Sequence, residues 1–238
     1  VHVKISFGGY SAKIMRRVLT FGFCPFIIIA GDSVLIIALN TVLQQYGGAQ
    51  GDMLIACATI VQSYMQIVTL PLGGIPSGTQ PVLSFNYGAK NIDRIRQGEK
   101  EIVKMAFAFC LVMFIISQTV SGIFVRLFTQ NPEYIALSIQ SIRIYTFGII
   151  PLALQYSFVD GLTALGIKVS VSLSVFRKVL FLVFTLALPA FFGASSAFYA
   201  EPIVDIFCGL FSTAVFLSII GRVLRKRQEM PEGQSLYS

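Results

Sequence analysis

Acidic side chains occur inside long apolar runs of this sequence, where an ionised group is costly. Asp32 is the clearest case, because it lies well inside an apolar run that begins near Val18 and ends near Leu39. If that run is a membrane helix, a rise of about 1.5 Å per residue places Asp32 roughly 20 Å into a hydrocarbon layer about 30 Å thick. A charge at that depth costs roughly 3 kcal/mol on insertion scales and is rare without a function. A carboxylate there can exchange a proton for a cation or bind Na⁺, so we predict that Asp32 is a cation-coupling residue.

Other ionisable residues lie in the later apolar runs. Asp160 comes late in the fourth run and is the second candidate for cation coupling, although its side chain can reach the membrane interface. Glu201 and Asp205 lie one helical turn apart in the last run, and Arg143 at a similar depth is their expected partner if they form a structural ion pair rather than a functional site. For Asp32, the sequence indicates no basic residue at a matching depth.

Two adjacent basic residues, Arg177 and Lys178, lie about two to three turns inside the fifth apolar run. Their long apolar stems allow the charged groups to reach back to the membrane interface, and that is the placement we expect. The alternative is that both side chains face an internal cavity.

Uncharged polar residues, Gln62, Tyr64 and Gln66, occur in the second apolar run. Gln62 and Gln66 are four residues apart and therefore share one face of a helix. These residues either line a polar substrate cavity or form hydrogen bonds between helices.

The second run also contains a cluster of helix-breaking residues, Pro71, Gly73, Gly74, Pro76 and Gly78. An internal proline removes a backbone hydrogen bond and clashes with the preceding turn. In lipid, the carbonyl groups freed in this way need other partners, so such a break faces protein or water. We therefore predict that this segment bends and acts as a conformational hinge.

Membrane helices must position these residues, because the composition does not suit a water-soluble surface. Of the 238 residues, 55% are apolar and only 12% are charged, with a mean hydropathy of +0.77; soluble domains usually contain about 25% charged residues. The net charge of +7 lies in clusters between apolar runs, which indicates membrane topology rather than nucleic-acid binding. Four isolated cysteines and a single histidine, His2, predict neither a disulfide framework nor a metal site.

We predict an all-α, polytopic membrane bundle of about six transmembrane helices. A span needs about 20 mostly apolar residues, and the six candidates cover residues 18–39, 54–83, 103–128, 136–164, 169–192 and 203–223. Six alternating spans place 16 of the 18 lysine and arginine residues on one side, with only Arg126 and Arg143 on the other. Because basic residues favour the cytoplasmic side, we expect both termini there and a multi-pass location in a cell membrane.

The map divides the chain into three regions. Residues 1–17 form a cytoplasmic segment, residues 18–223 form the six-helix transmembrane unit, and residues 224–238 form a cytoplasmic tail. The chain begins with Val1 rather than Met, so we expect it to be an excerpt of a longer protein.

The segment from Pro71 to Asn91, PLGGIPSGTQPVLSFNYGAKN, resembles a hallmark of the multidrug and toxic compound extrusion (MATE) family. In that family, a glycine-rich break leads to a Gln-Pro pair and then to an Asn-Tyr-Gly-Ala turn at the cytoplasmic face. Residues 158–168 and 174–178 are similar to the family's tenth and eleventh helices. Residues 200–205, AEPIVD, are similar to the twelfth helix of its bacterial drug-efflux branch. The resemblance extends over about residues 5–227.

The resemblance implies that the chain is the C-terminal lobe of a twelve-helix transporter with two pseudo-symmetric lobes around a central cavity. Its expected partners are the lipid bilayer, the missing N-terminal lobe and small organic cations as substrates. The first 17 residues would belong to the cytoplasmic connection between the lobes, and a bacterial cytoplasmic membrane would be the location. The implied activity is alternating-access export in exchange for Na⁺ or H⁺, with no other cofactor.

The resemblance also carries over to single positions. Some family members have an acidic residue in the seventh helix, ten residues after the glycine of an entry motif, and here Asp32 follows Gly22 by ten residues. Those members also have an aspartate in the tenth helix, a position that falls near Leu154 or Gln155. Gln155 is therefore assigned to the substrate cavity, and Asp160 lies more than one turn later.

Other functions remain open at the level of sequence. A lipid-linked oligosaccharide flippase would have a basic cavity rather than an isolated acid, and a partner-dependent half-transporter or a scaffold would also suit a six-helix chain. An enzyme is not expected, because the sequence contains no HExxH or GxSxG motif and no paired aspartates inside the spans. The sequence identifies neither the substrate nor the coupling ion nor the oligomeric state.

Overall fold

The computed structural model describes residues 11–229, except for the side chains of residues 17, 18, 20–25 and 27–29. Over this range the chain is all-helical, which confirms the predicted fold class. The helices are α1 (Ala12–Gly47), η1 (Gly48–Gln50), α2 (Gly51–Gly88), α3 (Ile92–Thr119), α4 (Ser121–Val125), α5 (Pro132–Tyr145), η2 (Thr146–Gly148), α6 (Ile149–Ala164), α7 (Val169–Phe192), η3 (Ala194–Tyr199) and α8 (Ala200–Glu229).

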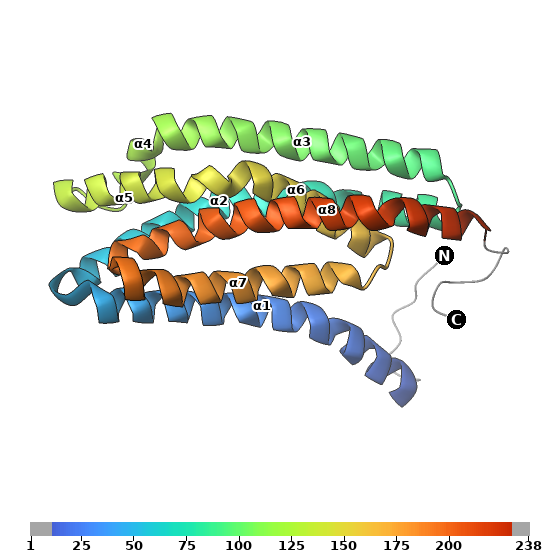
Figure 1. Ribbon diagram of the computed structural model, residues 1–238, viewed down its shortest axis with the longest axis horizontal. Helices are drawn as coiled ribbons and strands as arrows, with labels where there is room; N and C mark the ends of the chain where they lie inside the picture. Colours follow the sequence, from blue (N-terminus) through green and yellow to red (C-terminus); the bar gives the residue numbers. More distant parts are fainter. Residues whose placement is uncertain (1–10, 230–238) are drawn as a thin grey trace.

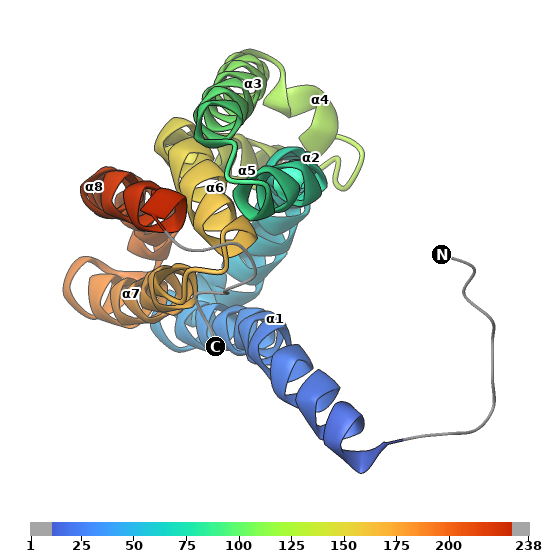
Figure 2. The same ribbon diagram turned by 90° about the vertical axis from the view of Figure 1, so that its right-hand side faces the viewer.

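The described helices form a bundle of six long rods, in which successive rods run in opposite directions (Figure 1). Five rods are α1, α2, α3, α7 and α8, and the sixth is made of α5, η2 and α6 in series. The predicted fifth span coincides with α7, and the first, second and sixth predicted spans lie inside α1, α2 and α8. The fourth lies within the series α5, η2 and α6. The third, 103–128, begins inside α3 and extends past the end of α4. In the end-on view of Figure 2, α6 lies in the middle of the bundle, with α3 and α1 on opposite sides of it.

Local sequence signals explain where the rods begin and end. The fourth rod begins at Pro132, and the Asn131 side chain before it accepts a hydrogen bond of 2.9 Å from the Glu133 N–H. Proline is favoured at the first helical position, and asparagine is a strong N-cap. Helix α7 ends at Phe192 and is followed by Gly193, which has φ of +84°, a conformation that glycine adopts without the steric cost of a Cβ atom.

Five segments of the described residues are long and apolar enough to cross a membrane. They are 30–88, 92–119, 132–164, 169–192 and 194–229. The first contains 59 residues, more than two single spans need, because it joins the second half of α1 to α2 through the short η1 turn. Helices α1 and α2 pack side by side, so this segment folds as a hairpin of two rods.

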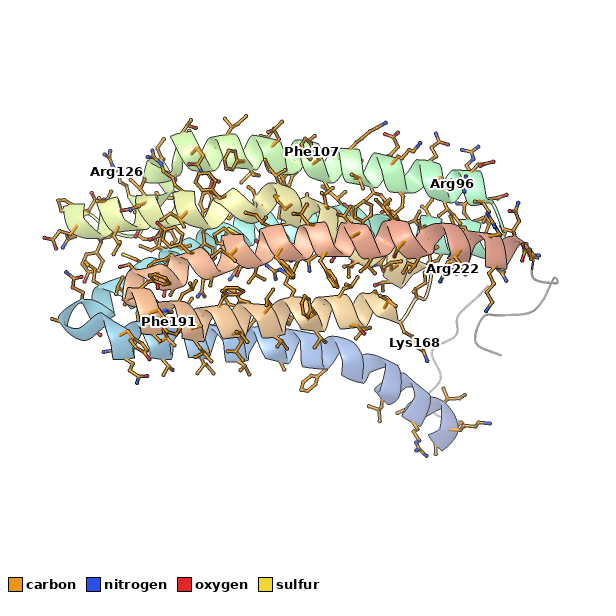
Figure 3. The ribbon with its side chains drawn as sticks, in the orientation of Figure 1. Arg96, Phe107, Arg126, Lys168, Phe191 and Arg222 are labelled. Atoms are coloured by element: carbon orange, nitrogen blue, oxygen red, sulfur yellow. The ribbon has the colours of Figure 1, made fainter. Side chains whose placement is uncertain are left out.

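The side chains at the surface have the polarity of a membrane protein. Large apolar side chains cover the flanks of the rods, including Phe107 on α3 and Phe191 on α7, which is 82% exposed. In Figure 3, Arg96, Lys168 and Arg222 lie together at one end of the bundle, and Arg126 lies at the other end. This separation agrees with the charge asymmetry on which the topology prediction depends.

Close packing of α6 against α8 depends on two glycines that face the partner helix. A Cβ atom on Gly209 of α8 would lie 2.4 Å from the backbone oxygen of Pro151 on α6. A Cβ atom on Gly148, the last residue of η2 directly before α6, would lie 2.9 Å from the Cα atom of Pro202 on α8. Small residues at such contacts allow membrane helices to approach backbone to backbone, so α8 packs closely against α6.

The proline- and glycine-rich segment of the second span does not interrupt the helix, because α2 remains helical from Gly51 to Gly88. Three prolines, Pro71, Pro76 and Pro81, lie inside it. Nearby hydroxyl groups donate to backbone carbonyls in this stretch, with Ser77 Oγ 2.7 Å from the Gly73 oxygen and Thr79 Oγ1 2.8 Å from the Pro76 oxygen. Such bonds help a helix to accommodate proline in a membrane. The role of this segment as a hinge remains a prediction.

The predicted terminal regions lie partly outside the described residues, which exclude 1–10 and 230–238. Helix α1 begins at Ala12 and α8 continues to Glu229, so both helices extend beyond the predicted membrane-spanning region, 18–223. The cytoplasmic placement of segments 1–17 and 224–238 remains a prediction.

Candidate functional site

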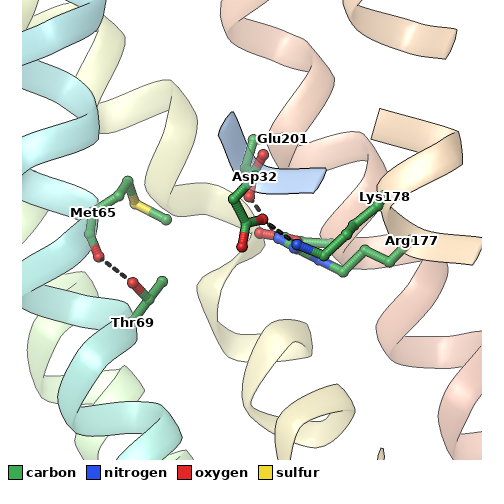
Figure 4. A network of polar contacts seen from close by, with 7 residues as sticks. Asp32, Met65, Thr69, Arg177, Lys178 and Glu201 are labelled. Atoms are coloured by element: carbon green, nitrogen blue, oxygen red, sulfur yellow. Dashed lines mark hydrogen bonds and ion pairs between the residues drawn. The ribbon is translucent and has the colours of Figure 1, made fainter. Parts of the chain in front are cut away.

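Arg177 of α7 is held between two carboxylates of α8 (Figure 4). Its Nε and Nη2 atoms donate to Asp205 Oδ1 at 3.0 and 2.6 Å, and Nη2 also donates to Glu201 Oε1 at 2.5 Å. Asp205 is completely buried, whereas the Arg177 side chain is 19% exposed. A buried carboxylate requires such a partner, because an isolated charge in a low-dielectric interior is very costly. This network fixes α7 to α8.

Lys178, the next residue along α7, forms an ion pair with Asp32 of α1. The two basic residues therefore pair with acids on different helices, because the side chains of adjacent residues point about 100° apart around a helix. The Lys178 side chain is largely buried, but the Asp32 side chain is 58% exposed on the open flank of α1. Asp32 thus combines a basic partner inside the lobe with access from outside it.

Both networks meet at a cavity of about 230 Å³ between α1, α6 and α7. It is lined by Asp32, Gln155, Tyr156, Val159, Asp160, Ser174, Arg177 and Lys178. Gln155 is almost fully buried, and its Oε1 atom has no hydrogen-bond partner among the described residues. Asp160 is half-buried and belongs to none of the ion pairs found in residues 11–229. The cavity wall therefore includes an amide oxygen without a hydrogen-bond partner and a carboxylate without an ion-pair partner among the described residues.

The charges around this cavity favour a cationic ligand. Four carboxyl groups, Asp32, Asp160, Glu201 and Asp205, lie at or directly behind its wall, whereas the basic groups are Arg177 and Lys178. Carboxylate and amide oxygens are suitable ligands for a hard cation. A proton or a metal cation bound at Asp32 or Asp160 would balance the excess of negative charge.

The structure corrects the sequence-based ion-pair assignments. Asp32 does have a basic partner, Lys178, and the partner of Glu201 and Asp205 is Arg177 rather than Arg143. The Arg143 side chain is exposed on α5. Arg177 and Lys178 do not reach back to the membrane interface, because carboxylates on two neighbouring helices, α8 and α1, provide closer partners.

The glutamines and tyrosine of α2 lie away from this cavity. Tyr64 is buried in the core, where its hydroxyl group is 2.9 Å from Ser117 Oγ on α3 and its ring packs edge-on against Phe124. Of the two predicted roles, Tyr64 therefore has the hydrogen bond between helices in this structure. Gln62 is half-buried, Gln66 is exposed, and neither contributes to the cavity wall.

The structure also places residues at the cavity that sequence reasoning missed. Tyr156 and Ser174 line it, and Gly73 of α2 lies close behind, where a Cβ atom would be 3.4 Å from the Tyr156 ring. Tyr156 directly follows Gln155, so the polar pair in α6 was the available signal. Ser174 precedes Arg177 by three residues on the same face of α7. No group of three possible metal-ligating residues of the His, Cys, Asp and Glu types occurs within the described chain.

Comparisons with known proteins agree with this architecture. Residues 29–188 match the family model described as MatE. A structure described as an inward-facing conformation of a multidrug resistance MATE family transporter of the MOP superfamily aligns with a TM-score of 0.82 and 17% identity, covering 93% of this chain and 51% of the other. An outward-facing conformation gives the same TM-score and identity, with 94% and 51% covered.

A third match is an MOP superfamily transporter from Pyrococcus furiosus, described with a binding pocket of reverse polarity that suggests a different function. It has a TM-score of 0.79 and 18% identity, covering 90% of this chain and 48% of the other. The search of curated proteins gave no match. The chain thus spans about half the length of the structures it matches, and at these identities the likeness establishes the fold.

Proposed function

Because this chain belongs to the MatE family, a family of transporters, we propose that it is the C-terminal lobe of a secondary active multidrug exporter. The complete transporter would expel small organic cations in exchange for Na⁺ or H⁺ by alternating access. The N-terminal lobe would supply the other half of the central cavity. Half-length coverage of transporters captured in inward-facing and outward-facing conformations supports this assignment.

The observation that carries the proposal is the ion pair between Asp32 and Lys178 at the edge of an acid-rich cavity. Lys178 acts as an internal cation that occupies Asp32 while no other cation is bound. An incoming proton, Na⁺ or organic cation competes with the ammonium group for the same carboxylate. Because these occupants exclude one another, binding of one changes the affinity for the next, which is the basis of exchange.

Other residues of the cavity complete the proposed site. The Asp160 carboxylate and Gln155 Oε1, which has no hydrogen-bond partner in the described part of the chain, are additional oxygen ligands for a coupling cation. Arg177 is not a ligand in this scheme, because Glu201 and Asp205 already occupy its guanidinium group. It holds α7 in the orientation that directs Lys178 towards α1.

The decisive experiment measures dye efflux from energised vesicles that contain the complete two-lobe protein. Asp32→Asn preserves the shape of the side chain but removes its charge, so we expect normal insertion and loss of gradient-driven efflux. Asp160→Asn is expected to have a milder effect. The matched control is Asp52→Asn, which removes an exposed carboxylate in the first turn of α2, outside the cavity. Normal efflux by Asp32→Asn would place the coupling acid elsewhere in the transporter.

A second candidate function is export of lipid-linked oligosaccharide. Arg177 and Lys178 bring two basic groups to the cavity, and one structural relative is described as having a pocket of reverse polarity. A flippase would depend on these bases for its pyrophosphate-linked substrate, and Lys178→Gln should then abolish transport while Asp32→Asn spares it. The opposite pattern supports cation exchange.

The proposal also covers the membrane in which the lobe lies, the side that its termini face and its partner. The lobe would lie in a bacterial cytoplasmic membrane with both termini in the cytoplasm, and it would depend on a partner lobe for activity. The alternative, a half-transporter that recruits its partner as a separate chain, predicts that the isolated lobe assembles with another six-helix subunit.

A further inference from the structure

A second cavity, of about 510 Å³, lies between α3 and α8 with α6 at its floor. Its walls are mainly apolar and include Ile95, Val103, Phe158, Phe216, Leu217 and Ile220. Phe158 and Phe216 stack with their ring centroids 4.4 Å apart, and Leu217 is 66% exposed. Figure 2 shows α3 on the side of α6 opposite α1, so this groove is separate from the cavity at Asp32.

Basic residues border this groove along α3. Arg96, Lys100 and Lys104 all line it and follow one another at intervals of four residues, which places them on one face of the helix. Lys104 is paired with the exposed Glu101 at 2.8 Å. Arg96 and Lys100 belong to none of the ion pairs found in residues 11–229.

A polar pocket of about 470 Å³ adjoins the groove, because Arg96 lines both. The remaining wall of the polar pocket is formed by Lys90, Asn91, Ile92, Asp93, Arg94 and Gln228. Three basic residues against one acid make this pocket suitable for an anion. An apolar groove that leads into a basic pocket matches an amphiphile with a hydrocarbon tail and a negatively charged head.

The groove and pocket lie at the end of the bundle where Arg96, Lys168 and Arg222 gather (Figure 3). Basic residues of a membrane protein concentrate at the cytoplasmic surface, and the cytoplasmic leaflet contains anionic lipids that basic pockets between helices bind. The available ligand with the required tail and head is therefore a membrane lipid.

We propose that the groove between α3 and α8 is a binding site for an anionic phospholipid. The acyl chain lies on Phe158 and Phe216, and the phosphate is bound by Arg96 and Lys100 at the entrance to the polar pocket. This inference does not depend on the transported substrate, because it concerns a surface of the lobe away from the cavity at Asp32.

An organic cation is the competing occupant, since Glu99 also lines the groove. The Glu99 side chain is directed towards α6, however, where a Cβ atom on Gly161 would lie 1.8 Å from Glu99 Oε1. Both Glu99 oxygens are buried and have no hydrogen-bond partner among the described residues. The carboxyl group is thus enclosed between α3 and α6, whereas the basic groups border the groove and are open to solvent.

The test uses native mass spectrometry of the complete transporter, purified in detergent and titrated with phosphatidylglycerol or phosphatidylcholine. We expect preferential retention of phosphatidylglycerol. The double variant Arg96→Gln/Lys100→Gln should weaken that binding by about thirtyfold, as expected for the loss of two basic residues near a membrane surface. Lys168→Gln/Arg222→Gln is the matched control, because it removes two exposed charges at the same end but outside both pockets.

The proposal would be overturned by equal retention of the two lipids, by an equal loss of binding in both double variants, or by displacement of the lipid by a hydrophobic ammonium dye. Displacement by inorganic phosphate alone would show that only a head-group anion is recognised, and would also contradict a lipid site. Leu217→Trp tests the groove independently, because it fills the acyl path without changing charge and should reduce phosphatidylglycerol binding in a protein that elutes normally from a sizing column.

Discussion

Arg177 is the residue on which the polar interior of the lobe most depends. Its guanidinium group compensates Asp205, which is fully buried, and Glu201, which is 15% exposed. Because these carboxylates share one cation, removal of that cation leaves two negative charges one helical turn apart in a low-dielectric environment. The adjacent Lys178–Asp32 pair is more exposed on its acidic side, so its contribution to stability is smaller.

Replacing Arg177 should therefore destabilise the protein strongly. We expect Arg177→Gln to cost about 3–5 kcal/mol, the range found when one partner of a buried ion pair is removed. The measurement is thermal unfolding in detergent, with Arg143→Gln as the matched control because that arginine is exposed and pairs with neither Glu201 nor Asp205. Adding Asp205→Asn should restore part of the loss, and an unfolding temperature unchanged by Arg177→Gln would contradict this account.

The pairing of individual residues was the part of the site that sequence could not predict. The depth of Asp32 in its run predicted an intramembrane acid, but its partner, Lys178, lies 146 residues away on α7. Helix α7 carries apolar residues around most of its circumference, so no periodicity indicates which way Arg177 and Lys178 point. Depth along a membrane normal can be counted from sequence, whereas direction around a helix depends on how neighbouring helices pack.

At the scale of helices, the contact between α6 and α8 depends on the absence of side chains. Gly209 lies against the backbone of Pro151, which cannot move aside as a flexible side chain could. Helix boundaries were more accessible to prediction, because Asn131-Pro132 and Gly193 act through local chemistry. The continuity of α2 was harder to predict from sequence, because hydroxyl groups and neighbouring helices can stabilise a helix that contains prolines.

Gly209→Ala should force α6 and α8 apart. A Cβ atom 2.4 Å from a backbone oxygen cannot be accommodated without a helix shift, so we expect a loss of about 1–3 kcal/mol, as for other overpacked positions. Gly221→Ala on the same helix is the control, because no atom lies within 4 Å of the added Cβ. Thermal unfolding of the two variants should separate them clearly; equal unfolding temperatures would show that the contact is not tight.

The predicted hinge in α2 can be tested without steric interference. A Cβ atom at Gly74 meets nothing within 4 Å, and one at Gly73 makes only an ordinary contact with Tyr156. We expect Gly73→Ala/Gly74→Ala to preserve expression and unfolding temperature while slowing efflux by the complete transporter, because alanine restricts the backbone more than glycine does. Unchanged efflux would reduce the segment to a packing feature. Gly221→Ala again serves as the control.

At the scale of the whole molecule, the distribution of charge and apolar surface defines an orientation. The basic residues Arg96, Lys168 and Arg222 share one end of the bundle, and apolar side chains cover the flanks. The sequence predicted this arrangement well, because alternation of spans and placement of lysine and arginine are both linear properties of the chain. The interface with a second lobe was inferred only from family resemblance, and the half-length match to transporter structures agrees with it.

The orientation can be measured by labelling single cysteines in a cysteine-free background of the complete protein. Ala49 in η1 and Ser195 in η3 lie in connections at the end opposite Lys168. Cysteine at either position should react with an impermeant reagent added to intact cells, whereas cysteine at Asn91, before α3, should react only after the membrane is opened. Labelling of position 91 from outside would invert the proposed topology.

The adjacency of Arg177 and Lys178 also restricts how this gene can change in length. Consecutive residues of α7 point about 100° apart, and each of these two basic residues serves a different helix. Insertion or deletion of one codon between Val169 and Arg177 would rotate both side chains away from their acids at once. A change of about one full turn would restore direction but shift both groups by about 5 Å along the axis. Natural relatives that keep both pairs should therefore vary in length in the loops around α7, and not within its first half.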